Sequence, residues 1–149
     1  MQTTEVTIVR ASLEHIELVA PLFDAYRQFY GQPSAVEKAH RFLTKRLSGN
    51  ESVVFLALSG GVAVGFTQLY PFFSSISMRR LWILNDMFVA ATARKQGIGA
   101  VLLERARQWA VETNAKGLIL ETMPDNPARK LYERKEWRRD ETFHYFLNV

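Results

Sequence analysis

The sequence predicts an α/β domain in which helices flank a central mixed, mostly antiparallel β-sheet, and three patterns lead to this prediction. Short runs that are wholly apolar, such as residues 53–58, are typical of buried strands. The Ser-Gly-Gly turn at residues 59–61 joins that run to a second one and predicts an antiparallel hairpin. From Ile98 onward, apolar side chains recur with the period of a helix that buries one face. Hairpins followed by a strand–helix–strand unit give a sheet of mixed direction.

The expected elements follow the chain from residue 5. Residues 5–10 alternate polar and β-branched side chains and predict the first strand. Ser12 is a suitable N-cap for the helix that follows, and Gly-Gln-Pro at 31–33 ends that helix. Residues 71–79 carry serines without a clear period and predict a loop. The other expected elements are a helix at 35–48, strands at 53–58, 62–70, 81–89 and 118–122, helices at 98–114 and 127–134, and last strands at Trp137 and 142–147. The expected order is therefore β-α-α-β-β-β-α-β-α-β-β.

Length and composition restrict the possible functions. The chain of 149 residues is expected to form one domain over residues 1–149. It contains no cysteine, which excludes disulfides, thiolate metal sites and cysteine nucleophiles, and its three histidines are far apart in the sequence, so no metal is expected. No apolar run approaches the roughly 20 residues that cross a bilayer. Residues 1–5 show no secretory signal. We therefore expect a cytoplasmic protein with no membrane partner.

The net charge of +4 allows an anionic partner. The basic residues are scattered, and the strongest local pair, Arg94 and Lys95, adjoins glycines. This setting suits a compact phosphate ligand better than nucleic acid, which is bound by extended basic surfaces. Nucleic acid is therefore not expected as a partner.

Residues 88–100 pass from a strand through a loop with two glycines into a helix. The start of a helix leaves backbone N–H groups unpaired and carries the positive end of the helix dipole. Gly97 and Gly99 would let this backbone approach an anion with no Cβ in the way. Arg94 and Lys95 add positive charge beside it. The segment therefore predicts a phosphate or pyrophosphate site.

Other glycine-rich phosphate loops fit this segment less well. A P-loop ends in Gly-Lys-Ser/Thr, whereas Gly99 is followed by Ala100 and Val101. A dinucleotide-binding fingerprint requires a small residue where Leu102 stands, and it belongs near the first strand of its fold. The remaining alternative is a helix that starts with glycines and binds nothing.

Two motifs resemble those of the GNAT N-acetyltransferase family. Arg94-x-x-Gly97-x-Gly99 is similar to the acetyl-CoA loop of that family, and residues 126–133 (Asn-Pro-Ala-Arg-Lys-Leu-Tyr-Glu) resemble its N-x-x-A-x-x-x-Y element. The element order is similar along the whole chain, which implies the GNAT fold. The pattern of an acidic strand residue, Phe-Val, the phosphate loop and this tyrosine also resembles the polyamine and small-amine acetyltransferase branch.

The sequence departs from the family pattern at one position. Glu136 stands before Trp137, where the family commonly has glycine before an aromatic residue. We expect Glu136 to avoid the positive φ that glycine would allow, with some strain or an altered turn.

The resemblance implies that acetyl-CoA is the acetyl donor. The backbone amides of residues 96–100 would hold its pyrophosphate, and residues 87–89 would align its arm by β-like hydrogen bonds, with one amide available as an oxyanion donor. Asn126 would bond the arm from the other side. The implied cofactor-binding residues are Met87, Phe88, Val89, Arg94, Lys95, Gln96, Gly97, Ile98, Gly99, Ala100, Asn126 and Arg129.

Acetyl transfer also requires acid–base groups. The resemblance makes Tyr132 the candidate acid, because a phenol of pKa about 10 can protonate a leaving thiolate; the alternative is a packed helix tyrosine. The amine must lose a proton, and Asp86, an acidic residue in an apolar strand, is the candidate base or substrate ligand. Asp86 could equally be a capped or salt-bridged carboxylate, and Glu121 invites the same two interpretations. Tyr30 is a candidate contact for the amine.

The leading functional hypothesis is an enzyme that acetylates a primary amine of a small molecule. A protein N-terminus or lysine is an alternative acceptor, and an acyl-CoA-binding sensor without catalysis is an alternative function. Family members are often dimers, and the alternating apolar residues Phe143, Tyr145 and Leu147 would suit strand pairing between two copies or within one. We expect a homodimer.

Overall fold

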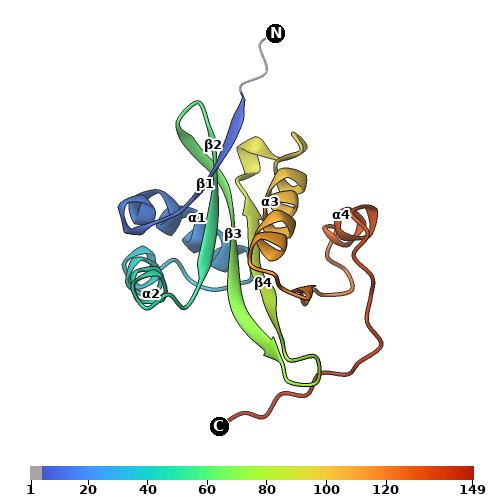
Figure 1. Cartoon of the computed structure of the whole chain (residues 1–149). Coiled ribbons are helices and arrows are strands. Elements are labelled where there is room, and N and C mark those ends of the chain that lie inside the picture. Colours follow the sequence, from blue (N-terminus) through green and yellow to red (C-terminus); the bar gives the residue numbers. More distant parts are fainter. Residues whose placement is uncertain (1–4) are drawn as a thin grey trace.

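The structure, a computed structural model, describes residues 5–149; residues 1–4, most of the segment examined for a secretory signal, lie outside it. A five-stranded sheet in the order β1-β2-β3-β4-β5 forms the centre (Figure 1). Neighbouring strands are antiparallel except for the parallel pair β4–β5. The predicted α/β class with a mixed, mostly antiparallel sheet is confirmed. The elements are β1 (Val6–Arg10), α1 (Ile16–Phe29), α2 (Val36–Ser48), β2 (Val53–Ser59), β3 (Val62–Ser74), β4 (Arg79–Val89), α3 (Ile98–Glu112), β5 (Gly117–Ile119) and α4 (Arg129–Arg134), with 3-10 turns at Leu13–His15 and Ala91–Ala93.

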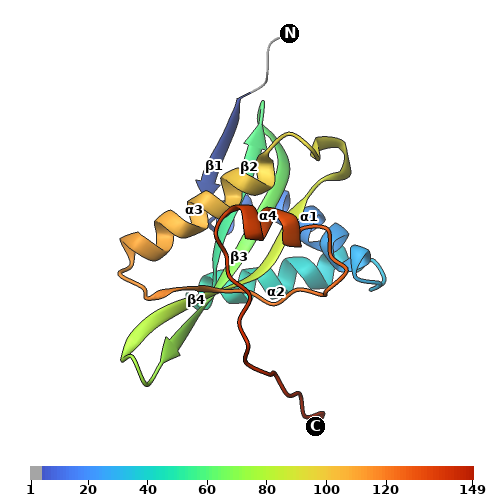
Figure 2. The same cartoon turned by 90° about the vertical axis from the view of Figure 1, so that its right-hand side faces the viewer.

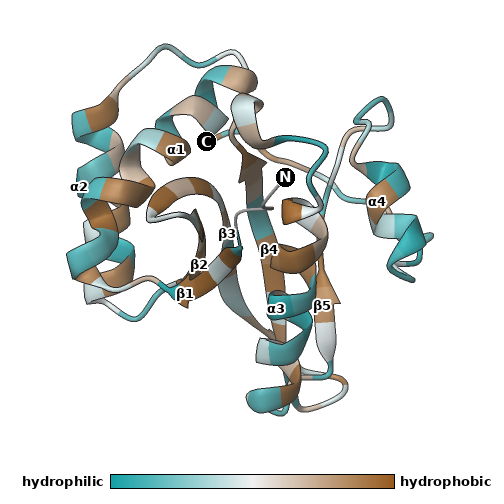
Figure 3. Ribbon diagram, turned by 90° about the horizontal axis from the view of Figure 1, so that it is seen from above, coloured by the Kyte–Doolittle hydropathy of each residue, from teal (hydrophilic) through white to brown (hydrophobic). Residues whose placement is uncertain are grey.

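Helices cover both faces of the sheet (Figure 3). α1 and α2 lie on one face, where they pack against Val54, Leu56 and Phe66. α3 lies on the opposite face, in the cluster that contains Phe55 and Leu69. Successive residues of β2 therefore point into two different cores, as in any strand buried on both sides. This explains why residues 53–58 of β2 are all apolar rather than alternating.

A buried carboxylate on α1 holds the loop between α1 and α2. Asp24 accepts hydrogen bonds from the backbone N–H of Ala35 (2.7 Å), the hydroxyl of Ser34 (2.7 Å) and Nε2 of Gln28 (3.0 Å). The Ala35 hydrogen bond has the largest effect in lowering the pKa of Asp24 below its usual value. The carboxylate thus fixes the point at which the chain enters α2.

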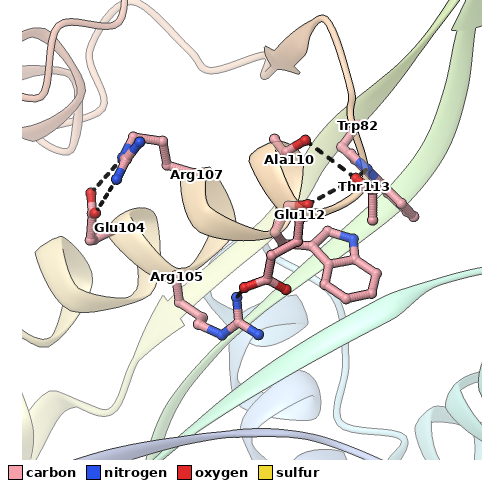
Figure 4. A network of polar contacts seen from close by, with 8 residues as sticks. Trp82, Glu104, Arg105, Arg107, Ala110, Glu112 and Thr113 are labelled. Carbon is pink, nitrogen blue, oxygen red and sulfur yellow. Dashed lines mark hydrogen bonds and ion pairs between the residues drawn. The ribbon is translucent and has the colours of Figure 1, made fainter.

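Hydrogen bonds also attach the end of α3 to β4 (Figure 4). The indole Nε1 of Trp82, a residue only 5% exposed, donates to Oγ1 of Thr113 (2.9 Å), and this hydroxyl donates to the carbonyl of Trp109 (2.8 Å). Earlier on α3, Arg107 and Glu104 form an ion pair at 2.6 Å that is exposed to solvent. The hydrogen bonds of Trp82 and Thr113 therefore join the end of α3 to β4, whereas an exposed ion pair contributes little to stability.

The predicted loop at 71–79 is wrong for most of its length. β3 continues to Ser74 and pairs there with Arg79 of β4, so that only residues 75–78 form the turn. This hairpin extends beyond the rest of the sheet (Figure 2). Phe72 and Phe73 are both exposed there. A strand with no buried face has no alternating pattern, which is why the sequence did not predict it.

The two strands predicted after α4 are also wrong. β5 covers Gly117–Ile119 rather than 118–122, and no strand follows α4 in the described chain. Residues 138–149 are exposed along their whole length and run away from α4 (Figures 1 and 2). Their alternating apolar pattern suits a strand, but a strand forms only beside another one, and no segment among residues 5–137 pairs with it.

Two negative findings apply to residues 5–149. No helix in this part of the chain is long and apolar enough to cross a membrane. Nor do any three of its His, Asp or Glu side chains come together in a way that could hold a metal ion.

Candidate active site

A cleft of about 850 Å³ opens where β4 and β5 separate. The two strands pair only from Leu81 to Ile83, opposite residues 117–119. β4 then continues to Val89 without a neighbour on this side, while its other edge remains paired with β3. The edge of β4 beyond Ile83 therefore offers free backbone N–H and C=O groups to the cleft, and such groups require a hydrogen-bonding partner.

A β-bulge at Asn85 determines which side chains reach the cleft. Gln68 of β3 pairs with Asp86 and the next residue, Leu69, pairs with Leu84, so that Asn85 is left unpaired. A bulge re-aims the side chains around it and increases the local twist of the strand. Asn85 consequently lines the cleft, whereas the neighbouring Asp86 does not.

The loop between β4 and α3 forms one end of the cleft. Lys95 (φ +63°) and Gly97 (φ +79°) both adopt left-handed backbone conformations, and Gly97 is the N-cap of α3. Val101 N donates to the carbonyl of Gly97 at 3.2 Å, but no side chain caps the first turn. The N–H groups of the first turn, at residues 98–100, lie along the cleft and have no intrahelical acceptor. This is the arrangement that binds phosphate at helix N-termini.

Gly99 keeps α3 and α4 close together at the cleft. A Cβ at this position would lie 3.1 Å from Cδ2 of Leu131 on α4. The predicted reason for glycine was approach to an anion; the structure adds the close approach of a second helix.

Arg94 bridges the loop and the end of α1. Its Nε donates to the carbonyl of Val89 (3.1 Å), and its guanidinium carbon lies 5.6 Å from the ring of Phe88 and 6.0 Å from that of Phe29. Both rings are within cation–π distance. The cation therefore lies in the lining of the same cleft as the first turn of α3.

Tyr132 faces these groups from α4. The residue is 9% exposed, its ring packs 6.1 Å from that of Trp137, and burial raises its pKa to about 12, with a smaller contribution from Tyr30. Its phenol therefore remains protonated at neutral pH and is available as a donor.

The turn after Tyr132 corrects the expectation for Glu136. This residue adopts φ +68°, the conformation that it was expected to avoid. Trp137 N donates to the carbonyl of Tyr132 (3.0 Å) and Glu136 N to that of Glu133 (3.1 Å). This is a Schellman C-cap, completed by the contact between the rings of Tyr132 and Trp137. The cap stabilises the left-handed residue although it is not glycine.

Three other predicted residues have local partners. Oδ1 of Asn126 accepts from Ala128 N (3.0 Å), and its Nδ2 donates to Thr122 (2.9 Å), so that its amide holds the turn before α4. Arg129 donates to the carbonyl of Pro124 (2.6 Å) and does not line the cleft. Glu121 does line it, and its carboxylate lies 3.3 Å from Nδ1 of His144.

The end of α1 contributes aromatic rings to the opposite wall. Tyr30 is half-exposed, and its ring contacts those of Tyr26 (5.1 Å) and Phe29 (5.2 Å) edge to face. All three residues line the cleft. An apolar wall of this kind can contact the body of a ligand, while the rings also attract a cation.

The structure brings most of the predicted site residues together in this one cleft. The exceptions are Asp86, Gln96 and Arg129. The sequence did not predict Asn85 as a site residue, because no sequence pattern predicts a bulge. It did not predict Phe29 either, although the neighbouring Tyr30 was a candidate. The predicted residues that line the cleft are Tyr30, Met87, Phe88, Val89, Arg94, Lys95, Gly97, Ile98, Gly99, Ala100, Glu121, Asn126 and Tyr132.

Comparison with known proteins agrees with this geometry. Residues 19–136 match the acetyltransferase (GNAT) family. The chain is 46% identical over 144 residues to an uncharacterised N-acetyltransferase, YhfO, of Bacillus subtilis (strain 168), covering 95% of this chain and 97% of the relative. It is 34% identical over 139 residues to a probable acetyltransferase of Haemophilus influenzae, covering 85% and 95%. It also superposes on the crystal structure of a probable acetyltransferase with a TM-score of 0.91 at 48% identity, covering 96% of this chain and 97% of that one. The chain therefore belongs to the GNAT family of acetyltransferases, which use acetyl-CoA as the acetyl donor.

Proposed function

We propose that this enzyme transfers the acetyl group of acetyl-CoA directly to a primary amine of a small molecule, such as a polyamine or an amino acid. One observation carries the proposal: a single cleft contains the free edge of β4, the uncapped start of α3 and Tyr132. The edge of β4 would bind an extended chain, the start of α3 would bind phosphate, and Tyr132 would donate a proton or a hydrogen bond.

The loop before α3 fits the pyrophosphate of the cofactor. The first-turn N–H groups would donate to the phosphate oxygens, and the left-handed Gly97 leaves that approach free of a Cβ. Arg94 would add a full positive charge at the same place. Among the described residues that line the cleft, no other segment combines free backbone N–H groups with basic side chains.

The edge of β4 fits the amide-bearing arm of the cofactor. Backbone groups of residues 84–89 can pair with its amides as a further strand would. The bound cofactor supplies a thioester, whose carbonyl carbon is the electrophile and whose sulfur is the leaving group. An N–H of Met87, Phe88 or Val89 directed at the thioester oxygen would stabilise the negative charge that develops there.

Tyr132 would donate a hydrogen bond to the leaving sulfur. As the amine nitrogen forms its bond to the carbonyl carbon, the carbon–sulfur bond breaks and the sulfur gains negative charge. A pKa of about 12 makes the phenol a weaker acid than a thiol of pKa about 8.5, so Tyr132 acts mainly as a donor to the thiolate, and solvent can complete the protonation.

The walls of the cleft favour a small amine as the acceptor. Among the described residues that line it, Glu121 is the only carboxylate, so no long acidic groove for a basic peptide is present. The half-exposed rings of Phe29 and Tyr30 flank the opening. The amine must reach the thioester uncharged, and its proton would pass to water in the open cleft. Asp86, the predicted base, lies outside the cleft and could receive the proton only indirectly, through water.

The test follows amine-dependent release of the CoA thiol with a disulfide reagent, to which this chain, having no cysteine, contributes no signal. We expect Tyr132→Phe to lower kcat about a hundredfold or more while acetyl-CoA affinity stays within a factor of about two. Tyr145→Phe, which removes the hydroxyl of an exposed tyrosine, is the matched control and should match the wild type. Arg94→Ala should weaken acetyl-CoA binding.

Two other results would change the proposed acceptor or the proposed activity. Turnover of lysine-containing peptides but of no free amine would replace the small-molecule acceptor with a protein. Acetyl-CoA binding without turnover of any amine would indicate a sensor.

We further propose that the chain, as one domain, acts as a homodimer in the cytoplasm. The exposed apolar side chains of residues 143–149 support the dimer. The need for acetyl-CoA supports a compartment that supplies this metabolite.

A further inference from the structure

An exposed aromatic residue at the end of α1 has no role in the core. Phe29 is the last residue of α1, lines the cleft and is 60% exposed. With more than half of its surface in contact with solvent, it adds little to the burial of apolar area that stabilises the fold. Its ring contacts the neighbouring Tyr30 edge to face at 5.2 Å. The reason for a phenylalanine at this position must therefore be sought in the cleft.

Arg94 is the charged group that lies beside this ring. Its guanidinium carbon is 6.0 Å from the centre of the Phe29 ring and 5.6 Å from that of Phe88. Its Nε donates to the carbonyl of Val89 (3.1 Å), while neither Nη1 nor Nη2 forms a hydrogen bond or an ion pair within residues 5–149. A guanidinium can contact aromatic rings with its face and still donate from its edge. The two terminal nitrogens thus remain available for an anion.

The next residue, Lys95, offers a comparison within the same loop. Lys95 also lines the cleft, but its side chain forms no ion pair and no cation–π contact in the described part of the chain. Long basic side chains lose rotamer freedom when an anion holds them, and this loss reduces affinity. Arg94 is already held by a carbonyl and two rings, so it loses less of this freedom on binding.

We infer that Phe29 is a positioning residue for Arg94: its ring holds the guanidinium ready for the pyrophosphate of acetyl-CoA and so raises the affinity for the cofactor. This inference rests on the proposed binding of the pyrophosphate by the loop before α3. It also separates Phe29 from Tyr30, although both flank the same opening. Phe29 acts on the cofactor, through Arg94, and not on the acceptor amine.

The first experiment is calorimetric titration of the intact chain with CoA in the absence of amine. Phe29→Leu keeps an apolar side chain but removes the ring, and we expect it to raise the Kd about two- to fivefold, the ratio that corresponds to an exposed cation–π contact. Phe29→Tyr keeps the ring and should keep the wild-type Kd. Phe73→Leu is the matched control: it removes a similarly exposed ring (62%) that lies 5.0 Å from Arg80, outside the cleft, and should leave the Kd unchanged.

A double-mutant cycle shows whether the ring acts through Arg94. In the Arg94→Ala background, Phe29→Leu should have no further effect on the Kd, because the cation that it positions is gone. In the Lys95→Ala background, Phe29→Leu should keep its full effect. If Phe29→Leu raised the Kd by the same factor in both backgrounds, the ring would contact the cofactor directly, and the inference would be overturned. An unchanged Kd in Phe29→Leu, or an equal loss of affinity in Phe29→Tyr, would also overturn it.

Turnover adds a readout that a general loss of structure would not give. Phe29→Leu should raise the KM for acetyl-CoA by a larger factor than it changes the KM for the amine or lowers kcat. A change confined to the KM for the amine would place the ring in the acceptor site and contradict the inference.

The same measurements separate this inference from the proposed function. If Arg94→Ala leaves the Kd for CoA unchanged, the proposed pyrophosphate site is wrong and the role of Phe29 is wrong with it. If Arg94→Ala raises the Kd while Phe29→Leu does not, the proposed function stands and only the positioning role fails.

Discussion

Asp24 and Asp86 are both 3% exposed, yet their surroundings change their pKa values in opposite directions. Asp24 accepts three hydrogen bonds, one of them from a backbone N–H, and these outweigh the cost of burial. Asp86 accepts only side-chain hydrogen bonds, and burial dominates. The first carboxylate therefore stabilises the fold as an anion, whereas burial disfavours the charged form of the second.

The role of Asp24 gives a prediction with a pH dependence. Because its pKa in the folded protein lies below that of the unfolded chain, its anion contributes stability above pH 3.8, and this contribution is lost as the pH falls through the folded value. Asp24→Asn should lower the free energy of unfolding by about 2 kcal/mol at pH 7, and the difference from the wild type should shrink below pH 4. Urea unfolding at several pH values measures this. A difference that stays constant with pH would mean that lost packing, not lost charge, is responsible.

At the scale of elements, the sequence predicted those whose residues alternate between buried and exposed positions or repeat with a helical period. α1 and α3 fall in this group because each buries one face, whereas β2 was predicted from its apolar run, which is buried on both faces of the sheet. The start of α3 was also predictable, since glycines next to basic residues before an apolar helical pattern are typical of a phosphate loop.

Features that depend on distant partners could not be read from the sequence. The bulge at Asn85 results from the register between β3 and β4, and a smaller cavity beside Asp86 results from the packing of α1 and α2 on that pair. Asp86 was singled out as an acidic residue in an apolar strand, but only the register shows which face of the sheet it occupies. The end of β3 went unpredicted because its residues are exposed.

The C-cap of α4 gives a prediction about backbone strain. Glu136 adopts φ +68°, which costs an L-residue roughly 1–2 kcal/mol. Glu136→Gly removes that cost but adds freedom to the unfolded chain, so we expect a net stabilisation of about 0.5–1 kcal/mol in urea unfolding. Lys135→Gly, one residue earlier at φ −92°, is the control and should destabilise the protein. Changes of the same sign in both variants would contradict this explanation.

The attachment of α3 to β4 gives a second prediction at this scale. Thr113→Val keeps the shape of the side chain but leaves the buried Trp82 Nε1 without an acceptor (Figure 4), which should cost about 1–3 kcal/mol of unfolding free energy. Glu104→Gln breaks the exposed ion pair with Arg107 on the same helix and should have no measurable effect. Thermal and urea unfolding of both variants test the difference. Equal losses would show that the buried hydrogen bond is not what holds α3 in place.

For the whole molecule, the exposed end of the chain is the feature that a single copy does not explain. Side chains of residues 143, 145, 146, 147 and 149 are each at least 83% exposed. Several exposed apolar side chains in one short segment are typical of an interaction site, which supports the proposed dimer. One edge of β5 pairs with β4 and the other is free, and His144 lies 3.3 Å from Glu121, two residues after β5. The alternating segment could pair with the free edge of β5 in a second copy, as the proposed dimer requires.

Sedimentation of the intact chain should therefore show a dimer, and deletion of residues 141–149 should give a monomer. Because those residues form no helix or strand in the single chain, the far-ultraviolet circular dichroism of the truncated protein should retain the signal of the folded domain. Replacing Phe143, Tyr145 and Leu147 together by serine should also dissociate the dimer, whereas replacing Arg138, Arg139 and Glu141 by serine should not, because removal of apolar area, and not of charge, weakens such an interface. A monomeric intact chain, or a dimer that persists after the deletion, would show that the apolar end of the chain does not join two copies.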